Sequence, residues 1–287
     1  MSPREPVFGP EWSDSLRRGT EGELRGWVDA ALHWCDETDA IALRHFRQDI
    51  EVEQKPDRTF VTVADTSIEQ RLREHIADAF PGHGVVGEEY GTDAGDATTR
   101  WYIDPIDGTH NYIRGVPIFA SLLAVEREGE LQAAVISAPA LGQRWYGWRG
   151  GGAWAAGGAR SESARVRTSR ITDLADAQVL YTSPIDLDRS GRAPGFRSLL
   201  ESAWRDRGFG DFWSYTLVAE GAAEAMLEID LKTWDAAAPT LLVEEAGGRV
   251  TDFDGNRRID SRTILATNGH LHDAVRSVLV GSEETSR

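Results

Sequence analysis

Two carboxylates in one short turn are the residues of this sequence best suited to chemistry. Asp104 and Asp107 lie in the segment Trp101-Tyr-Ile-Asp-Pro-Ile-Asp-Gly-Thr109. Pro105 keeps Asp104 extended, because the proline ring clashes with a helical residue before it. Asp107 follows three residues later across a tight turn, so both carboxylates can face the same side as the main-chain carbonyl of Ile106. Three hard oxygen donors of this kind are typical of a magnesium site.

The two residues that follow these acids suit an anion. Gly108 lets the main chain approach a ligand closely. If Thr109 begins a short helix, its first amides point at the ligand from the positive end of the helix dipole. The segment is therefore predicted to bind metal and phosphate together. On these residues alone a second interpretation stays open, in which Asp104 and Asp107 only cap main-chain amides at a corner.

The string Asp104-Pro-Ile-Asp-Gly-Thr109 resembles the signature of the inositol monophosphatase family, which comprises magnesium-dependent phosphatases. Other segments resemble the same family and occur in the expected order. They are residues 55–65, the Gly-Glu-Glu string at 87–89, and the pair 234–237 and 245–248. The resemblance extends from about residue 23 to residue 280.

This resemblance implies a set of metal ligands. One Mg2+ ion is expected on Glu88, Asp104 and the carbonyl of Ile106. A second is expected on Asp104, Asp107 and Asp235. Glu88 would also face a weaker third ion, so the site would hold two to three Mg2+ ions.

The resemblance also implies the remaining parts of a hydrolytic mechanism. Asp65 and Thr109 would orient and activate the attacking water, with Glu88 beside them, and the amides of Gly108 and Thr109 would hold phosphate oxygens. Hydrolysis of a phosphomonoester by such a site needs no covalent intermediate, since bound metal neutralises the phosphate and stabilises the leaving alkoxide. As an isolated residue, Asp235 would instead be interpreted as a helix cap.

The segment Gly210-Asp-Phe-Trp-Ser-Tyr215 bears on the substrate, because it resembles the histidinol-phosphatase branch of the family. Asp211 stands where inositol phosphatases typically have a small residue. Histidinol phosphate carries an ammonium and an imidazole, so Asp211, with Glu228 nearby, would bind a cation that inositol lacks. In a purely structural interpretation, Asp211 caps the helix that follows it.

The function implied is that of a histidinol-phosphate phosphatase of histidine biosynthesis. The first alternative is an inositol-1-monophosphatase of broad specificity, and the second is a catalytically silent relative with a binding role. One departure from the family is His110, where related chains often have Lys, Asn or Thr.

The amino-acid composition limits the kinds of partner that this protein is expected to bind. The 287 residues include 47 acidic and 31 basic ones, and the formal charge of -16 disfavours nucleic acid and anionic membranes. A small phosphorylated substrate then requires metal to offset the local carboxylates. Cys35 is the single cysteine, which excludes an internal disulfide and favours a reducing cytoplasm. The first 22 residues do not resemble a secretory signal, and no apolar run is long enough to span a membrane.

Apolar periodicity predicts the elements that must position these residues. Helices are expected over 23–46, 67–80, 196–207, 215–223, 235–245 and 271–280. Strands are expected in a hairpin over 50–63, from Gly84 into Glu88 and Glu89, and over 101–103, 116–125, 131–137, 144–148, 178–181, 225–229, 249–253 and 263–266. Residues 91–99 are expected to be a loop, and acids on helix faces such as Glu69 and Glu74 are expected to be solvated.

The expected fold class is α/β. A polar tail over 1–22 precedes an α+β half over 23–150 that carries the metal-binding motif, and an α/β half over 151–287 completes the active site. The resemblance implies a layered α-β-α-β-α sandwich of the inositol monophosphatase and fructose bisphosphatase type, with the active site between the halves. It also implies a homodimer.

Overall fold

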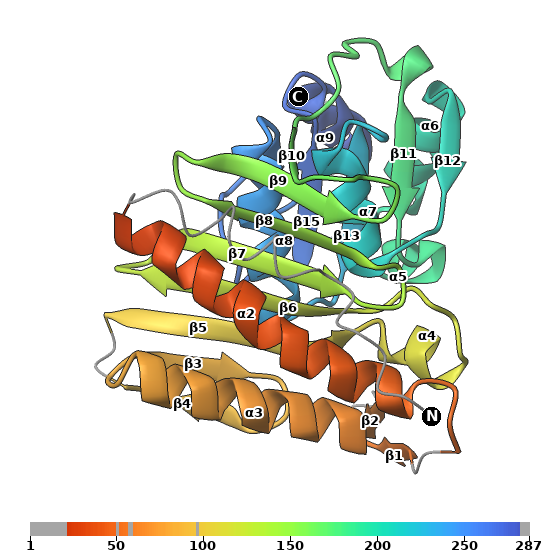
Figure 1. Ribbon diagram of the computed structural model, residues 1–287. Coiled ribbons are helices and arrows are strands. Elements are labelled where there is room, and N and C mark those ends of the chain that lie inside the picture. Colours follow the sequence, from red (N-terminus) through yellow and green to blue (C-terminus); the bar gives the residue numbers. More distant parts are fainter. Residues whose placement is uncertain (1–21, 50–51, 57–59, 96–97, 282–287) are drawn as a thin grey trace. The chain divides into compact units, whose positions relative to one another are not determined.

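The computed structural model describes residues 22–49, 52–56, 60–95 and 98–281. The expected polar tail, apart from Gly22, lies outside these residues. The chain forms two compact units, Met1–Arg165 and Val166–Arg287. Figure 1 follows the chain through both units by colour, from red to blue. No helix among the described residues is long and apolar enough to cross a membrane.

Among the described residues, the N-terminal unit combines three helices, a small hairpin and a large sheet. The helices are α2 (Gly22–His45), α3 (Val63–Ala79) and α4 (Thr109–Ile113), and β1 (Val52–Gln54) pairs with β2 (Phe60–Thr62) in the hairpin. The sheet consists of β3 (Gly84–Gly87), β4 (Gly91–Asp93), β5 (Thr99–Asp107), β6 (Ala120–Arg127), β7 (Glu130–Ala138), β8 (Gln143–Trp148), β9 (Gly152–Gly157) and β10 (Ala164–Val166).

The spatial order of this sheet is β10-β9-β8-β7-β6-β5-β3-β4. From β5 to β9 each strand pairs antiparallel with the next, whereas β3 is parallel to β5. Glu128 and Gly129 both have positive φ, 54° and 84°, at the turn between β6 and β7. A two-residue turn of that kind matches the twist of the strands it joins.

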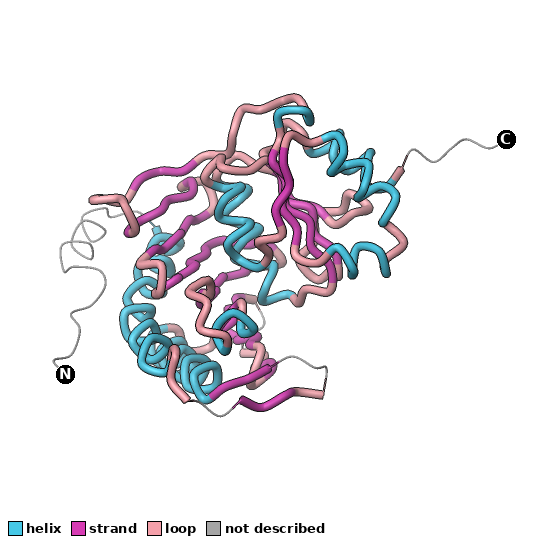
Figure 2. Tube along the Cα trace, turned by 90° about the vertical axis from the view of Figure 1, so that its right-hand side faces the viewer, coloured by secondary structure: helices cyan, strands magenta, loops and turns pink. Residues whose placement is uncertain are grey.

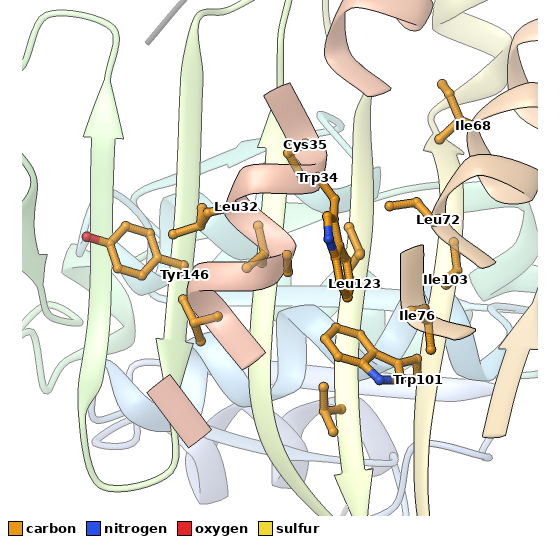
Figure 3. Packing of buried hydrophobic residues seen from close by; sticks show 14 of the residues in the cluster. Leu32, Trp34, Cys35, Ile68, Leu72, Ile76, Trp101, Ile103, Leu123 and Tyr146 are labelled. Atoms are coloured by element: carbon orange, nitrogen blue, oxygen red, sulfur yellow. The ribbon is translucent and has the colours of Figure 1, made fainter. Parts of the chain in front are cut away.

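Helices α2 and α3 pack side by side on one face of the sheet (Figure 1). Their buried residues recur every three or four positions, so each helix buries one stripe. Figure 3 shows Trp34 of α2, Leu72 and Ile76 of α3, and Trp101 and Ile103 of β5 meeting in this core. Full burial of each such side chain contributes about 1.5–3 kcal/mol to stability.

One arginine is buried beneath α2. Arg144 of β8 is 1% exposed and donates to Asp39 at 2.6 Å, to Asp36 at 2.8 Å and to Ser137 Oγ at 2.9 Å. Asp39 is also buried, so the two opposite charges are removed from water together. A buried charge is tolerated only with such partners.

The C-terminal unit is built on a five-stranded sheet. Its strands are β11 (Gln178–Tyr181), β12 (Arg205–Arg207), β13 (Ala225–Ile229), β14 (Arg249–Thr251) and β15 (Thr263–Thr267), in the order β12-β11-β13-β15-β14. Strands β12, β11 and β13 are parallel, and β15 is antiparallel to both of its neighbours. The helices are α5 (Pro184–Arg189), α6 (Ala193–Ser202), α7 (Asp211–Ala219), α8 (Thr233–Glu245) and α9 (His272–Val280), with a 3-10 turn at Leu174–Asp176.

Helices cover both faces of this sheet (Figure 2). Val179, Ala225 and Leu227 pack with α5, α6 and α9 in one core. Because successive residues of a strand face opposite sides, Leu180 and Met226 face the other side, where α7 and α8 pack on β13 and β15. This arrangement agrees with the predicted α/β character of the C-terminal half.

Most of the predicted elements are confirmed, but several boundaries are wrong. Helix α3 begins at Val63 instead of Ser67, because Thr62 caps it. The helix predicted over 196–207 ends at Ser202, and its last residues form the edge strand β12. Helix α7 begins four residues earlier than predicted, and the predicted loop over 91–99 contains β4. Strand β10 and helix α5 were not predicted at all.

Candidate active site

The central segment is a strand that continues through a bulge. The sequence predicts Asp104 at the end of a strand, whereas β5 extends to Asp107. Asp104 pairs with Leu122 and Asp107 with Ala120, so two residues of β5 face one residue of β6. Pro105 has no amide hydrogen to donate, and its carbonyl accepts a bond from Ser121 Oγ at 2.7 Å. The bulge interrupts the ladder between the two carboxylates.

The main chain turns sharply after Asp107. Gly108 has a φ of 81° and precedes α4, which begins at Thr109 as the sequence predicts. Thr109 Oγ1 donates to the carbonyl oxygen of Ile106 at 2.9 Å. A carbonyl oxygen has two lone pairs, so this bond leaves one available to a second partner. The segment therefore exposes oxygen donors at a fixed corner of the sheet.

Asp104 and Asp107 differ in exposure. The side chain of Asp104 is buried, with 2% of the residue exposed, and Asp107 is half-buried. His110 lies exposed two residues after Gly108, and its ring packs edge-on against Phe60 of β2, with centroids 5.2 Å apart. The β1-β2 hairpin thus touches the short helix that follows the two aspartates.

Asp65 is the third residue of α3, not the residue before it. Its Oδ2 accepts from Thr62 N at 2.8 Å and from Thr62 Oγ1 at 2.6 Å, which fixes the carboxyl at the start of the helix. Its Oδ1 is buried and accepts no hydrogen bond from any residue that the structure describes. Burial raises the pKa of Asp65 to about 6, and the Glu88 carboxylate adds to the rise while the Thr62 bonds oppose it.

Glu88 and Glu89 follow β3 in a turn. Both carboxylates contact Lys55. Lys55 Nζ lies 2.8 Å from Glu88 Oε1 and 2.6 Å from Glu89 Oε1. Burial alone would lower the pKa of Lys55, but the two carboxylates outweigh it and raise that pKa. Lys55 is a site residue to which sequence reasoning gave no role of its own.

The donor set of this unit suits a hard cation. Its donors are the carboxylates of Glu88, Asp104 and Asp107 and the carbonyl of Ile106, and all of them are oxygens. Oxygen donors are those that Mg2+ prefers. Across the described ranges, no three His, Cys, Asp or Glu side chains are grouped as a preformed metal centre. Instead, the Lys55 ammonium supplies the positive charge beside Glu88.

The C-terminal unit holds Asp235, Glu228 and Asp211. Asp235 is the third residue of α8, and its Oδ2 accepts from the N-cap amide of Lys232 at 2.7 Å. Asp65 makes the same contact at the start of α3. The interpretation of Asp235 as an N-cap is therefore wrong by three positions, although it does satisfy the first amide of the helix.

Glu228 near the end of β13 is held by two hydroxyl groups. Tyr215 Oη donates to its Oε2 at 2.5 Å, and Thr182 Oγ1 donates to its Oε1 at 2.8 Å. Burial raises the pKa of Glu228 to about 7, and the nearby carboxylates of Asp211 and Asp235 contribute to the rise. The three predicted acids of this unit are thus close enough to interact. Tyr215 and Thr182 were not predicted as partners, because their contacts depend on the fold.

Asp211 is the first residue of α7 and has an unusual backbone. Its φ is 49°, and the N-cap position belongs to Gly210, which has no side chain. The structural interpretation of Asp211 as a helix cap is therefore wrong. A left-handed conformation costs a residue other than glycine about 1–3 kcal/mol, and such strain is concentrated at functional sites.

Comparison with known proteins agrees with the fold. The model of the inositol monophosphatase family matches residues 23–283, and the chain belongs to this family.

Two relatives are histidinol-phosphatases. That of Streptomyces coelicolor is 42% identical over 250 residues, which cover 85% of this chain and 93% of the relative. That of Mycobacterium tuberculosis is 41% identical over 247 residues, covering 85% of this chain and 94% of the relative.

Solved structures share the fold. The Thermotoga maritima IMPase superposes with a TM-score of 0.79 at 28% identity, covering 89% of this chain and 97% of that one. An IMPase/NADP phosphatase complexed with Mg2+ and phosphate has a TM-score of 0.78 at 22% identity, covering 91% of this chain and 98% of that one.

Proposed function

We propose that this protein is a magnesium-dependent phosphomonoester hydrolase that converts L-histidinol phosphate and water to L-histidinol and phosphate, in histidine biosynthesis. The hydrolase class is that of the family and of both relatives. The observation that carries the choice of substrate is the acidic cluster of Asp211, Glu228 and Asp235, in which Glu228 is held by two hydroxyl groups. A cluster of carboxylates suits a cationic alcohol better than a neutral polyol.

The metal ligands proposed are those that the sequence suggests. Glu88, Asp104 and the Ile106 carbonyl would hold one Mg2+ ion, and Asp104, Asp107 and Asp235 a second, with a third near Glu88. Bound Mg2+ would supply a Lewis acid that neutralises the phosphate oxygens and the leaving alkoxide. The charge of Lys55 beside Glu88 supports the same assignment, because it marks a place where the chain needs a cation.

Asp65 and Thr109 are proposed to orient and activate the attacking water. Oδ2 of Asp65 is taken up by Thr62, and the buried Oδ1 could accept a proton from water. Thr109 Oγ1 donates its hydrogen to the Ile106 carbonyl, so its lone pairs are left to act as acceptors. The amides of Gly108 and Thr109 would hold phosphate oxygens at the start of α4.

Asp211 and Glu228 are proposed to bind the cationic end of the substrate. Tyr215 and Thr182 each hold one oxygen of Glu228, which fixes the direction of its carboxyl. A cation that pairs with Glu228 would also relieve the repulsion from Asp211 and Asp235. The ammonium or the imidazolium of histidinol could serve, and inositol has no such group.

Steady-state kinetics on three substrates would test the proposal. Purified enzyme with Mg2+ is assayed on histidinol phosphate, inositol-1-phosphate and fructose-1,6-bisphosphate, and kcat/KM is compared. We expect histidinol phosphate to exceed the other two by tenfold or more. A tenfold preference for inositol phosphate would favour a broad-specificity inositol-1-monophosphatase. No turnover of any of the three would favour a binding protein.

We further propose that the enzyme acts in the cytoplasm as a homodimer. The single cysteine, Cys35, is buried, and burial raises the pKa of its thiol to about 12, which keeps the thiol protonated. The mass of the purified protein by light scattering would test the dimer. A mass near twice 31.6 kDa is expected, and a mass near 31.6 kDa would contradict it.

A further inference from the structure

A buried carboxylate of α3 lies behind the turn that carries Glu88 and Glu89. The sequence suggests that Glu69 is solvated on a helix face, but the residue is 0% exposed. Its Oε2 accepts from Glu89 N at 2.6 Å, and its Oε1 accepts from Tyr90 N at 3.1 Å. Both oxygens therefore bind consecutive amides of a segment that is 20 residues further along the chain.

Gly87 is shaped to this contact. A Cβ atom at position 87 would lie 2.0 Å from Glu69 Oε1 and 2.4 Å from its carboxyl carbon. Real Cβ atoms do not approach other atoms this closely, so only glycine lets the carboxylate reach the turn. The glycine of the Gly-Glu-Glu string is thus explained by Glu69 and not by a special φ angle, since its φ is not positive.

Arg73 completes the contact one helical turn later. Its Nε donates to Glu69 Oε1 at 2.8 Å, and its Nη2 donates to the carbonyl of Gly91. The buried charge of Glu69 is thereby compensated by a guanidinium, as a buried carboxylate requires. Together the two side chains hold the turn from both ends, at the amides of Glu89 and Tyr90 and at the carbonyl of Gly91.

The turn fixed in this way contains Glu88 and Glu89, whose carboxylates contact Lys55. Glu88 N also donates to the Ile103 carbonyl at 3.2 Å, which ties the turn to β5. Side chains that hold a metal ligand in place typically change metal affinity or activity by about 10–100-fold when they are mutated. The two oxygens of Glu69 accept hydrogen bonds from the amides of Glu89 and Tyr90 and from Arg73, so Glu69 acts on Glu88 through the main chain of the turn.

We propose that Glu69 is a positioning residue, which acts through the amides of Glu89 and Tyr90 to hold Glu88 in the geometry that binds metal. The inference rests on the proposed function in one respect, the assignment of Glu88 as a Mg2+ ligand. Gly87 and Arg73 support the same contact. Gly87 leaves room for the Glu69 carboxylate, and Arg73 balances its charge.

The main test is Glu69→Gln, compared with Glu74→Gln as a matched control. Glu74 lies on the same helix, but it is exposed and pairs with Arg71 at 2.9 Å. Gln at position 69 offers one acceptor oxygen in place of two and no charge for Arg73. We expect the dissociation constant for Mn2+, titrated calorimetrically into the metal-free protein, to rise about tenfold or more. The control is expected to match the wild type.

Hydrogen exchange provides a readout that does not depend on catalysis. In the wild type the amides of Glu89 and Tyr90 are expected to exchange slowly for a turn, and in Glu69→Gln at least about tenfold faster. Fast exchange of both amides in the wild type would overturn the proposal even if the variant failed to fold. Gly87→Ala is the second variant, and it is expected to weaken Mn2+ binding as Glu69→Gln does.

The outcomes separate this inference from the proposed function. Weakened Mn2+ binding in Glu69→Gln together with no turnover of histidinol phosphate by the wild type would retain the positioning role and refute the function. Turnover by the wild type with unchanged Mn2+ affinity in a well-folded Glu69→Gln would refute the positioning role and retain the function. A lower melting temperature with unchanged metal affinity would mean that Glu69 serves stability alone.

Discussion

The two units satisfy their buried carboxylates with different kinds of donor. In the N-terminal unit the donors include basic side chains. Asp39 pairs with Arg144, Glu69 with Arg73, and Glu88 and Glu89 share Lys55.

In the C-terminal unit three carboxylates have neutral donors, whereas Glu244 pairs with Arg257. Glu224 Oε2 accepts from the amide of Gln178 at 2.6 Å, and Asp252 accepts from the amide and side chain of Asn256. Glu228 accepts from two hydroxyl groups. Each of these three carboxylates accepts from groups that carry no charge.

This difference teaches how each unit would treat a ligand. A carboxylate beside an ammonium has a counter-charge, and a metal cation can take over the place of that ammonium. Burial and the neighbouring acids make Glu228 keep its proton to a higher pH, although its hydroxyl bonds oppose this, and a cationic ligand would relieve the crowding. Burial raises the pKa of Asp65 to about 6 and that of Glu89 to about 7, so these two carboxyls of the N-terminal unit also keep their protons to a higher pH. For Asp65 this suits the proposed role of accepting a proton from water.

The largest effect is expected from the proposed metal ligands. Asp107→Asn should lower kcat by about a thousandfold or more on every substrate, because metal charge stabilisation is worth several kcal/mol and each 1.36 kcal/mol is tenfold in rate. Asp235→Asn should do the same, although it lies in the other unit. Both variants are assayed across Mg2+ concentrations beside Asp78→Asn, an exposed aspartate of α3. Wild-type turnover in both would refute the metal assignment.

The next effect concerns stability and tests the comparison directly. Asp39→Asn should destabilise the protein by about 3–5 kcal/mol, because it leaves the buried charge of Arg144 poorly compensated. Glu224→Gln should cost about 1 kcal/mol, because an amide oxygen still accepts from Gln178. Urea unfolding followed by tryptophan fluorescence measures both, with Asp78→Asn as an exposed control. An equal loss in the two buried variants would show that the donor type is immaterial.

A smaller and selective effect is expected at Glu228. Glu228→Gln should lower kcat/KM for histidinol phosphate by about 10–100-fold, since hydrogen bonds to charged groups contribute about 1.5–3 kcal/mol. The value of kcat/KM for inositol-1-phosphate should change less than about threefold, because that substrate has no cationic group that could pair with Glu228. Equal losses on both substrates would mean that Glu228 does not choose between them.

The smallest effect is a pH dependence. Because the pKa of Glu228 is about 7, its carboxylate is protonated below that pH, and kcat/KM for histidinol phosphate should rise toward pH 7 by at most tenfold per unit. This rise should be larger for histidinol phosphate than for inositol-1-phosphate, and Glu228→Gln should remove the difference. The linked stability has the opposite sign. The folded state keeps this proton up to about pH 7 and the unfolded chain loses it near 4.5, so the stability of the fold falls as pH rises between these values.

The local elements were largely predictable. The apolar stripe of α2, the hairpin between β6 and β7 and the helix start at Thr109 follow from residues that are neighbours in the chain. The start of α3 was missed because Thr62 caps it in competition with the strand pattern of β2. Strand β12 was missed because its three residues are strand only by pairing with β11.

The sequence by itself determined the fold class and the acids at element ends, because periodicity and turn chemistry depend on near neighbours. Only the tertiary structure decided which acids receive a charge partner. Lys55 and Glu88 are 33 residues apart, Asp39 and Arg144 105, and Glu69 and the amide of Glu89 20. Whether a carboxylate is buried and what compensates it depends on segments that meet only when the chain has folded. No local pattern carries that information.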